Sequence, residues 1–252
     1  MNYTAERVNE NTQWNTPVFN RQLFAYEESV KYIKGDVLEI GCGEGYGAKL
    51  LSPYSRSYTG IDKFETANKH NLKNVNFLKM NVPTIKGLES NSFDLVISFQ
   101  VIEHIQNDAL FIEEIHRLLK TNGTLIFTTP NLKMSLTRNP FHIKEYVLEE
   151  FEGLMSKFSS YKLLGTYGNE KVMDYYEKNK ASVEKITRFD IFNFQYNLPR
   201  VLLQTPYNIA NFINRKMLIR KNTELTTSIQ TSDYSLKPAD DTCLDFFCIA
   251  TK

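Results

Sequence analysis

The stretch from Val37 to Gly47 constrains the fold of this chain more than any other. An apolar run, interrupted only by Glu39, is followed by glycines at every second position. This pattern predicts a buried strand that turns into a helix through a loop without side-chain bulk. Gly41, Gly43 and Gly45 allow positive φ angles and let a ligand lie directly on the backbone. We therefore expect a ligand site at this turn.

The spacing argues against two well-known phosphate-binding loops. A G-x-G-x-x-G fingerprint would need glycine where this chain has Tyr46, and the Gly-Lys-Ser/Thr ending of a P-loop is absent. A second strand-like run, Ser57 to Ile61, ends in Asp62. A carboxylate at the end of the second strand can accept hydrogen bonds from both hydroxyls of a ribose. The expected ligand therefore contains a nucleoside.

Four motifs in order carry a resemblance to a known family. They are Glu39–Gly45, Gly60–Asp62, Phe93–His104 and Leu118–Gly123. Together they resemble the class I S-adenosylmethionine-dependent methyltransferases, in particular the small-molecule branch called methyltransferase type 11, which includes bacterial enzymes of surface-polysaccharide and quinone pathways. The resemblance covers roughly residues 35 to 167, and the ordered set is more specific than any single motif.

The resemblance implies an α/β fold with a doubly wound, Rossmann-like sheet of seven strands, of which the last is antiparallel and follows a helical insertion. From the alternating patterns we expect strands near residues 36–40, 57–61, 75–80, 93–98, 124–129, 161–167 and 243–250. Helices are expected near residues 20–33, 45–52, 64–69, 107–120 and 146–158.

A chain of 252 residues is long enough for one such domain with a small cap. We expect an N-terminal helical segment over residues 1–34, a methyltransferase core over 35–168 and 241–252, and a helical insertion or cap over 169–240. Within the cap, residues 174–188 and 207–219 have helix-like patterns. Residues 215–221 are basic and amphipathic, which fits an anionic membrane surface or a lipid-linked substrate, or else a solvated helix face.

Composition narrows the partners and the compartment. Thirty Lys and Arg against 29 Asp and Glu leave no global positive field for nucleic acid. The chain has three cysteines, Cys42, Cys243 and Cys248, without C-x-x-C spacing. This odd number and this spacing argue against a disulfide framework and a structural zinc site. The chain has no apolar leader or run of the roughly 18 residues that span a bilayer. We expect a soluble, cytoplasmic protein without nucleic-acid partners, and a homodimer stays open.

The resemblance also implies which residues meet S-adenosylmethionine. The glycine loop would contact its amino-acid tail, Glu39 would set that loop or balance the ammonium, and Asp62 would hold the ribose. Asn81 stands where the family usually has an acid that meets the adenine; its amide oxygen can still accept from the adenine amino group. The expected cofactor-binding residues are Glu39, Gly41, Cys42, Gly43, Gly45, Asp62, Lys63, Asn81, Val82, Phe99 and Gln100.

Methyl transfer needs alignment of the two partners, and a base if the nucleophile is a hydroxyl. His142, on the loop after the fifth strand, and His104 are the candidate catalytic residues; structural roles are the alternative for both. Related quinone-pathway enzymes carry Glu-x-x-Glu-His and are associated with a divalent metal. Here the first acid is replaced by Gln100, and an amide is the poorer ligand, so we expect no metal.

The N-terminal segment offers weaker candidates for lining the substrate pocket, namely Tyr3, Arg7, Trp14 and Tyr26. We expect transfer of a methyl group to an oxygen of a small molecule, or of a sugar or glycan precursor. The preference for a sugar rests on the resemblance alone. Two alternatives stay open: N-methylation of an amino sugar, and a module that binds S-adenosylmethionine without catalysis.

Overall fold

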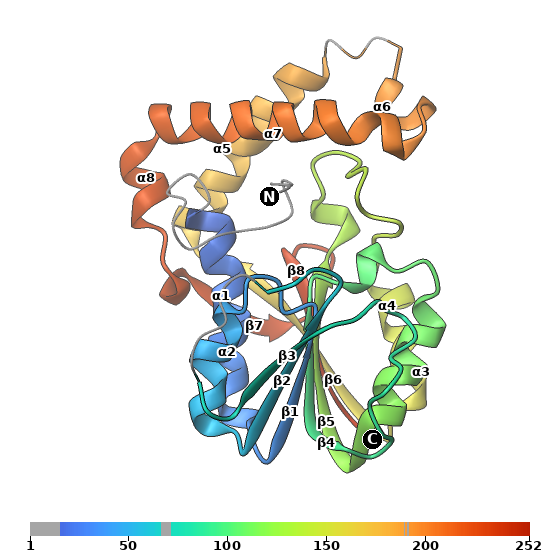
Figure 1. The fold of residues 1–252 in the computed structure, drawn as a ribbon. Helices are drawn as coiled ribbons and strands as arrows, with labels where there is room; N and C mark the ends of the chain where they lie inside the picture. Colours follow the sequence, from blue (N-terminus) through green and yellow to red (C-terminus); the bar gives the residue numbers. More distant parts are fainter. Residues whose placement is uncertain (1–15, 67–71, 189, 191) are drawn as a thin grey trace.

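The computed structural model describes residues 16–66, 72–188, 190 and 192–252. Its centre is one eight-stranded sheet with the order β3-β2-β1-β4-β5-β8-β6-β7 (Figure 1). The strands are β1 (Asp36–Ile40), β2 (Ser57–Asp62), β3 (Val75–Lys79), β4 (Phe93–Phe99), β5 (Leu119–Pro130), β6 (Ser160–Gly168), β7 (Tyr234–Pro238) and β8 (Asp245–Thr251).

Strands β1 to β5 run parallel to one another, and β8 runs antiparallel to both β5 and β6. The strand order reverses at β1, with β2 and β3 on one side and β4 and β5 on the other. All five parallel strands end at the same edge of the sheet. A crevice is expected there, outside the carboxyl ends and beside the reversal point.

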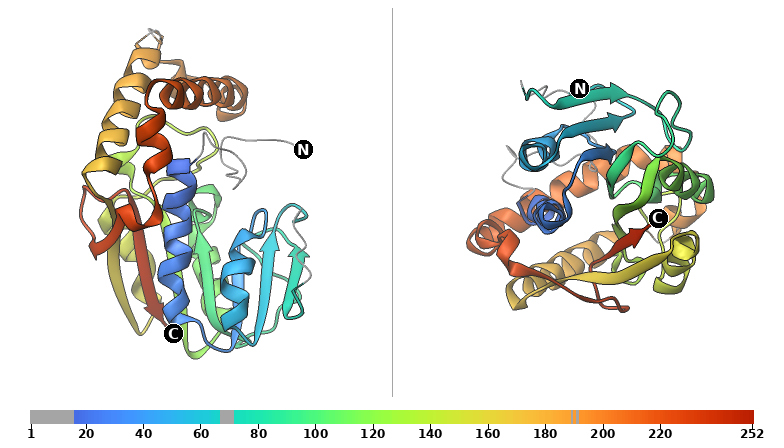
Figure 2. Two further views of the ribbon diagram at one scale, coloured as in Figure 1. Left: turned by 90° about the vertical axis from the view of Figure 1, so that its left-hand side faces the viewer. Right: turned by 90° about the horizontal axis from the view of Figure 1, so that it is seen from below.

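Helices cover both faces of the sheet, and others lie beyond its carboxyl edge (Figures 1 and 2). The α-helices are α1 (Thr16–Ser29), α2 (Tyr46–Leu51), α3 (Asp108–Leu118), α4 (Leu148–Leu154), α5 (Glu170–Thr187), α6 (Phe194–Asn197), α7 (Arg200–Lys221) and α8 (Thr223–Ser228). We call α5 to α8 the cap, because α7 lies across the top of the molecule in Figure 1.

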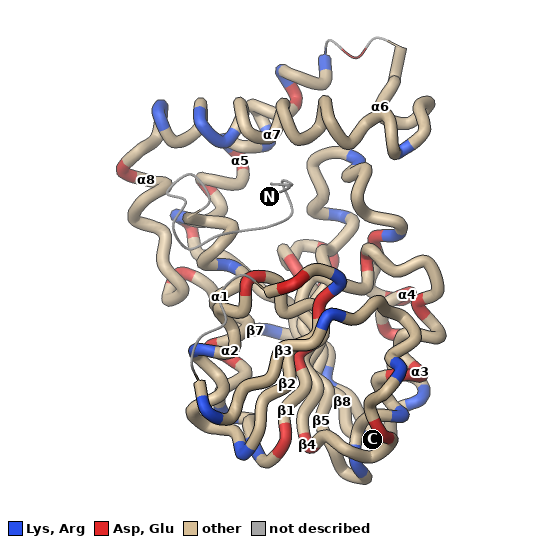
Figure 3. Tube along the Cα trace, viewed as in Figure 1, with Lys and Arg blue, Asp and Glu red and all other residues tan. Residues whose placement is uncertain are grey.

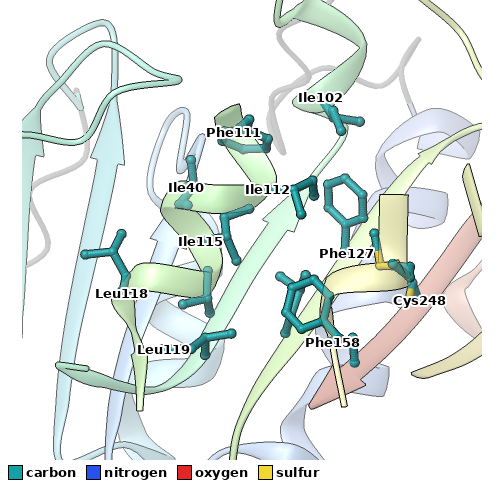
Figure 4. Packing of buried hydrophobic residues seen from close by; sticks show 14 of the residues in the cluster. Ile40, Ile102, Phe111, Ile112, Ile115, Leu118, Leu119, Phe127, Phe158 and Cys248 are labelled. Atoms are coloured by element: carbon teal, nitrogen blue, oxygen red, sulfur yellow. The ribbon is translucent and has the colours of Figure 1, made fainter. Parts of the chain in front are cut away.

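Two buried clusters hold the helices to the sheet. Ile40 of β1 lies with Phe111 and Ile115 of α3 in one buried cluster (Figure 4), to which Leu38 also belongs. Their neighbours along the strands pack with α1 and α2 on the other face. Because side chains alternate along a strand, a sheet covered on both faces needs mostly apolar residues, and Glu39 and Ser98 are the polar residues in the buried parts of β1 and β4. This packing fixes the carboxyl edge.

The predicted α/β fold is confirmed, including the antiparallel last strand. Helix α3 follows its sequence pattern closely: Asn107 caps it by accepting from the Leu110 backbone N–H at 3.0 Å, and its apolar face is buried. Residues 148–154 and 46–51 are helical where helices were expected.

Three expectations need correction. The sheet has eight strands instead of seven, because residues 234–238 pair with β6 as an additional edge strand. The stretch before the last strand is therefore not helical throughout. The helix expected over residues 64–69 is absent from 64–66, and the rest lies outside the described residues. Helix α7 begins at Arg200, seven residues before the predicted start, and contains Pro206.

Candidate functional site

A cavity of about 670 Å³ lies at the carboxyl edge of the parallel strands. Its walls come from α1, the loops after β1, β2, β3 and β4, the segment after β5, and α7. Eleven of the thirteen expected site residues line it: Gly41, Cys42, Gly43, Asp62, Lys63, Asn81, Val82, Phe99, Gln100, His104 and His142. Tyr26 does so too, whereas Glu39 and Gly45 do not.

Asp62 ties the glycine loop to the end of β2. Its Oδ2 accepts from the Gly43 backbone N–H at 3.0 Å, and its Oδ1 accepts from the Phe64 N–H at 2.9 Å. A carboxylate has about four acceptor positions, and these two bonds use two of them. Gly41, Gly43 and Gly45 all have positive φ, as the loop requires. A Cβ on Gly43 would meet no atom within 4 Å, because that position faces open space.

Glu39 lies behind the glycine loop and is only 1 % exposed. Its Oε1 accepts from the Tyr26 hydroxyl and its Oε2 from the Tyr58 hydroxyl, both at 2.5 Å. Burial raises the pKa of Glu39 to about 7, against the lowering effect of the two tyrosines. Tyr26 comes from α1 and lines the cavity. Its hydrogen bond to Glu39 therefore links this part of the cavity wall to the sheet.

Two further loops complete the part of the cavity next to the sheet. Asn81 and Val82 follow β3, and Lys63 lies at the exposed side with its Nζ 5.3 Å from the centre of the Phe64 ring. At the end of β4, Gln100 has a φ of 57° and its backbone N–H donates to the Thr128 carbonyl at 3.0 Å. Non-glycine residues with positive φ are uncommon and often mark functional turns.

His142 is held by two neighbours on its own loop. Its Nδ1 lies 2.6 Å from Glu145 Oε1 and must carry the proton, since a carboxylate only accepts. Its Nε2 lies 2.8 Å from Asn139 Nδ2 and therefore accepts. The Asn139 orientation agrees with this, because its Oδ1 accepts from the Phe141 N–H at 3.0 Å. The tautomer thus presents a basic Nε2 in the cavity wall.

Comparisons with known proteins agree with this geometry. Residues 38–127, which include β1, the glycine loop and Asp62, match the family described as a methyltransferase domain. These residues are a class I S-adenosylmethionine-dependent methyltransferase domain. The match ends within β5, so it covers the parallel strands and none of the cap.

Relatives extend the similarity beyond the methyltransferase domain. A probable S-adenosylmethionine-dependent methyltransferase of Mycobacterium tuberculosis is 31 % identical over 182 residues, which are 66 % of this chain and 64 % of that protein. The chain thus spans somewhat less than two thirds of that relative's length. The ubiquinone biosynthesis O-methyltransferase of Pelagibacter ubique is 29 % identical over 201 residues, 74 % of this chain and 77 % of that one.

Solved structures agree on the fold. A methyltransferase from Thermotoga maritima, titled a possible histamine N-methyltransferase, has a TM-score of 0.58 at 18 % identity. The superposition covers 95 % of this chain and 93 % of that chain. At this identity the likeness speaks for the fold alone.

The cavity of the methyltransferase domain fits the cofactor of its family. The cavity lining includes an open glycine backbone at Gly43, an acceptor carboxylate at Asp62 and an amide at Asn81, together with the apolar side chains of Val82 and Phe99. These are groups that an amino-acid tail, a ribose and an adenine require. Concave sites with few polar groups among apolar walls are typical for small ligands of this size.

Glu103, His104 and His142 form a compact group in the same cavity. Each offers one possible metal-ligand atom, and these atoms lie within 4.8 Å of one another. A carboxylate with two imidazoles suits a transition metal. Two of the three also bond within the protein: Glu103 accepts from Thr129, and the His104 Nδ1 donates to the Phe141 carbonyl at 2.9 Å, a kind of second bond that metal-binding histidines also make. That the protein needs no metal stays a prediction.

Sequence reasoning missed the polar groups that enter the cavity from helices. Arg21 and Gln22 come from α1, and Gln204, Tyr207 and Arg215 come from α7. Only Arg215 had a sequence signal, since it opens the basic stretch. Tyr3, Arg7 and Trp14 lie outside the described residues. Arg21 is further fixed by a 3.2 Å ion pair with Asp245, which is 4 % exposed at the start of β8.

Proposed function

We propose that this protein transfers a methyl group from S-adenosylmethionine to an oxygen of a small molecule, or of a sugar or glycan precursor. One observation carries the proposal: Asp62 and the glycine loop meet at 3.0 Å on the wall of a cavity that also contains His142. The proposed nucleoside site and the candidate base thus line the same cavity.

The residues divide the work of such a reaction. Asp62 accepts from the ribose, the Gly41–Gly45 loop contacts the amino-acid tail, and Asn81 and Val82 border the adenine. When bound, S-adenosylmethionine supplies a methyl group on a sulfonium, and transfer leaves a neutral thioether. His142 Nε2 takes the proton of the acceptor hydroxyl once that hydroxyl replaces the Asn139 amide, and Glu145 keeps the ring in this tautomer.

The lining away from the sheet supports a polar acceptor. Gln22, Gln204 and Arg215 bring hydrogen-bond donors, and Phe141 and Tyr207 bring aromatic rings whose centres are 6.1 Å apart. Hydroxyl-rich ligands such as sugars use both kinds of contact. The name of the Pelagibacter relative, an O-methyltransferase, favours oxygen over nitrogen. N-methylation of an amino sugar is the second candidate, because the same polar wall would bind one.

We also assign roles to the parts of the chain. Residues 35–168 and 241–252, together with β7, form the catalytic core, residues 16–34 close one side of it, and α5 to α8 are the cap over the acceptor. The cytoplasm suits the three cysteines, which are all free and buried.

The experiment starts with calorimetry of S-adenosylmethionine binding to the wild type and to Asp62→Ala. Loss of charge-assisted hydrogen bonds to the ribose should weaken binding by about tenfold or more. Methyl transfer is then assayed on candidate acceptors, with sugars and nucleotide sugars first.

Glu65→Ala is the matched control, because Glu65 is an exposed carboxylate near Asp62 that does not line the cavity. Circular dichroism checks that Asp62→Ala is folded, since the change also removes two turn hydrogen bonds. Unchanged affinity in folded Asp62→Ala would remove Asp62 from the site. Tight binding without turnover on any acceptor class would instead support the non-catalytic module.

A further inference from the structure

Helix α7 turns its polar side toward the protein. Gln204, Tyr207 and Arg215 line the cavity. Asn214 is 3 % exposed and bonds to α5, donating to Asn179 Oδ1 at 2.8 Å and accepting from Ser182 at 2.5 Å. A helix on the surface of a water-soluble domain normally buries its apolar side. In α7, by contrast, several of the side chains that face the protein are polar.

The opposite side of α7 exposes large apolar side chains. Val201 is 76 % exposed, Leu202 63 %, Ile209 56 % and Ile213 48 %. Leu202, Ile209 and Ile213 follow one another at helical spacing, so they form one stripe. The segment before α7, which includes α6, adds further exposed rings, those of Phe192, Phe194 and Tyr196. Exposed apolar surface that is continuous along an element marks an interaction site more often than isolated apolar residues do.

The charges on this segment are of one sign. From Phe192 to Thr223 the sequence has five basic residues, Arg200, Arg215, Lys216, Arg220 and Lys221, and no Asp or Glu. The whole chain, in contrast, is nearly balanced at a net charge of +1. Figure 3 shows α7 with Lys and Arg but without acidic positions, and the basic residues gather toward its C-terminal end.

We propose that α7 lies in the surface of an anionic membrane, with the stripe Leu202, Ile209 and Ile213 in the headgroup and acyl boundary and with Arg220 and Lys221 on anionic headgroups. An exposed apolar row next to basic residues is what such a surface recognises. A second copy of the chain fits less well, because residues 192–223 contain no Asp or Glu that could pair with the basic residues of a partner's α7.

In the proposed contact, α7 lies in the surface of the membrane and does not span the bilayer. Among the residues that the structure describes, no helix is long and apolar enough to span a bilayer. The inward side of the same helix lines the cavity, so the acceptor end of the cavity would lie next to the lipid surface. The proposal does not depend on methyl transfer, since it concerns the outer side of α7 only.

Vesicle flotation of the full chain tests this proposal, with phosphatidylcholine vesicles that do or do not contain phosphatidylglycerol. We expect flotation with the anionic vesicles only, weakened by added salt. Ile209→Ser with Ile213→Ser should lower vesicle affinity by about tenfold or more, because burial of the stripe is lost. Arg220→Gln with Lys221→Gln should lower it to a similar degree on anionic vesicles.

Tyr54→Ser is the matched control, because Tyr54 is 62 % exposed on the short helix just before β2, near the opposite edge of the sheet; it should float like the wild type. The charge variant keeps the test decisive if the serine variant fails to fold. The proposal is overturned if the wild type ignores anionic vesicles, or if both double variants bind like the wild type. A dimer in light scattering that Ile213→Ser dissociates would also overturn it, in favour of a second copy.

Discussion

Glu39 makes the stability of the fold depend on pH. Its pKa is raised from 4.5 to about 7, mainly by burial. The folded state therefore binds a proton more tightly than the unfolded chain. The stability that comes from this proton is complete below pH 4.5 and is lost as pH rises toward 7. Glu39→Gln has no titrating group at this position and keeps its stability as pH rises. The free energy of unfolding of the variant minus that of the wild type should therefore increase between pH 5 and pH 8, by at most about 3 kcal/mol.

Urea unfolding of both proteins at several pH values measures this difference. Glu27→Gln on the exposed side of α1 is the control and should follow the wild type at every pH. If Glu39→Gln and wild type give parallel profiles, the Glu39 carboxylate is ionised in the fold across the whole range and its buried position costs little.

His142 is the residue whose replacement should separate catalysis from binding. His142→Ala removes the proposed base, so kcat should fall by about a hundredfold or more while the affinity for S-adenosylmethionine stays unchanged. Glu145→Gln keeps a hydrogen-bond partner for the ring and should have a smaller effect. Turnover assays and calorimetry on the same samples measure both quantities.

His116→Ala serves as the control, because His116 lies on α3, packs against Phe158 and does not line the cavity. Full turnover in His142→Ala would show that this histidine has a structural role in its loop. Equal losses in kcat and in cofactor affinity would argue that the loop itself has collapsed.

Single residues differ in how far the sequence predicts their place. Asp62 and the glycines could be placed because strand ends and positive φ have local signatures. The place of Glu39 could not, because its partners Tyr26 and Tyr58 come from α1 and β2 and meet it only in the folded protein. The pairing of His142 with Glu145 was not predicted, although the two residues are only three positions apart in the loop.

At the scale of elements, prediction was accurate where one local pattern decides. Helix α3 has a cap and a continuous apolar face, and its start was found at Asn107. Strand β7 was missed because an edge strand of five residues is defined by its pairing with β6, which lies more than sixty residues earlier. The predicted start of α7 came too late in the sequence because proline usually breaks a helix, whereas Pro206 lies inside α7.

At the scale of the whole molecule, the cavity joins parts that are distant in the sequence. Arg21 from α1, Asp62 from β2 and Tyr207 from α7 share its wall. A ligand that binds only the folded chain stabilises all of these parts together. At a hundredfold excess over Kd this stabilisation is about 2.7 kcal/mol, so S-adenosylmethionine should raise the unfolding midpoint by roughly 5 to 10 °C.

Scanning fluorimetry measures the midpoint, and hydrogen exchange locates the effect. Protection should appear in the loop 41–45 and in α1, because both border the cofactor end of the cavity. The same concentration should shift the midpoint of Asp62→Ala less, since that variant binds more weakly. An equal shift in both proteins, or protection confined to regions away from the cavity, would mean that the ligand binds elsewhere. Such a result would contradict a cofactor site at the carboxyl edge of the sheet.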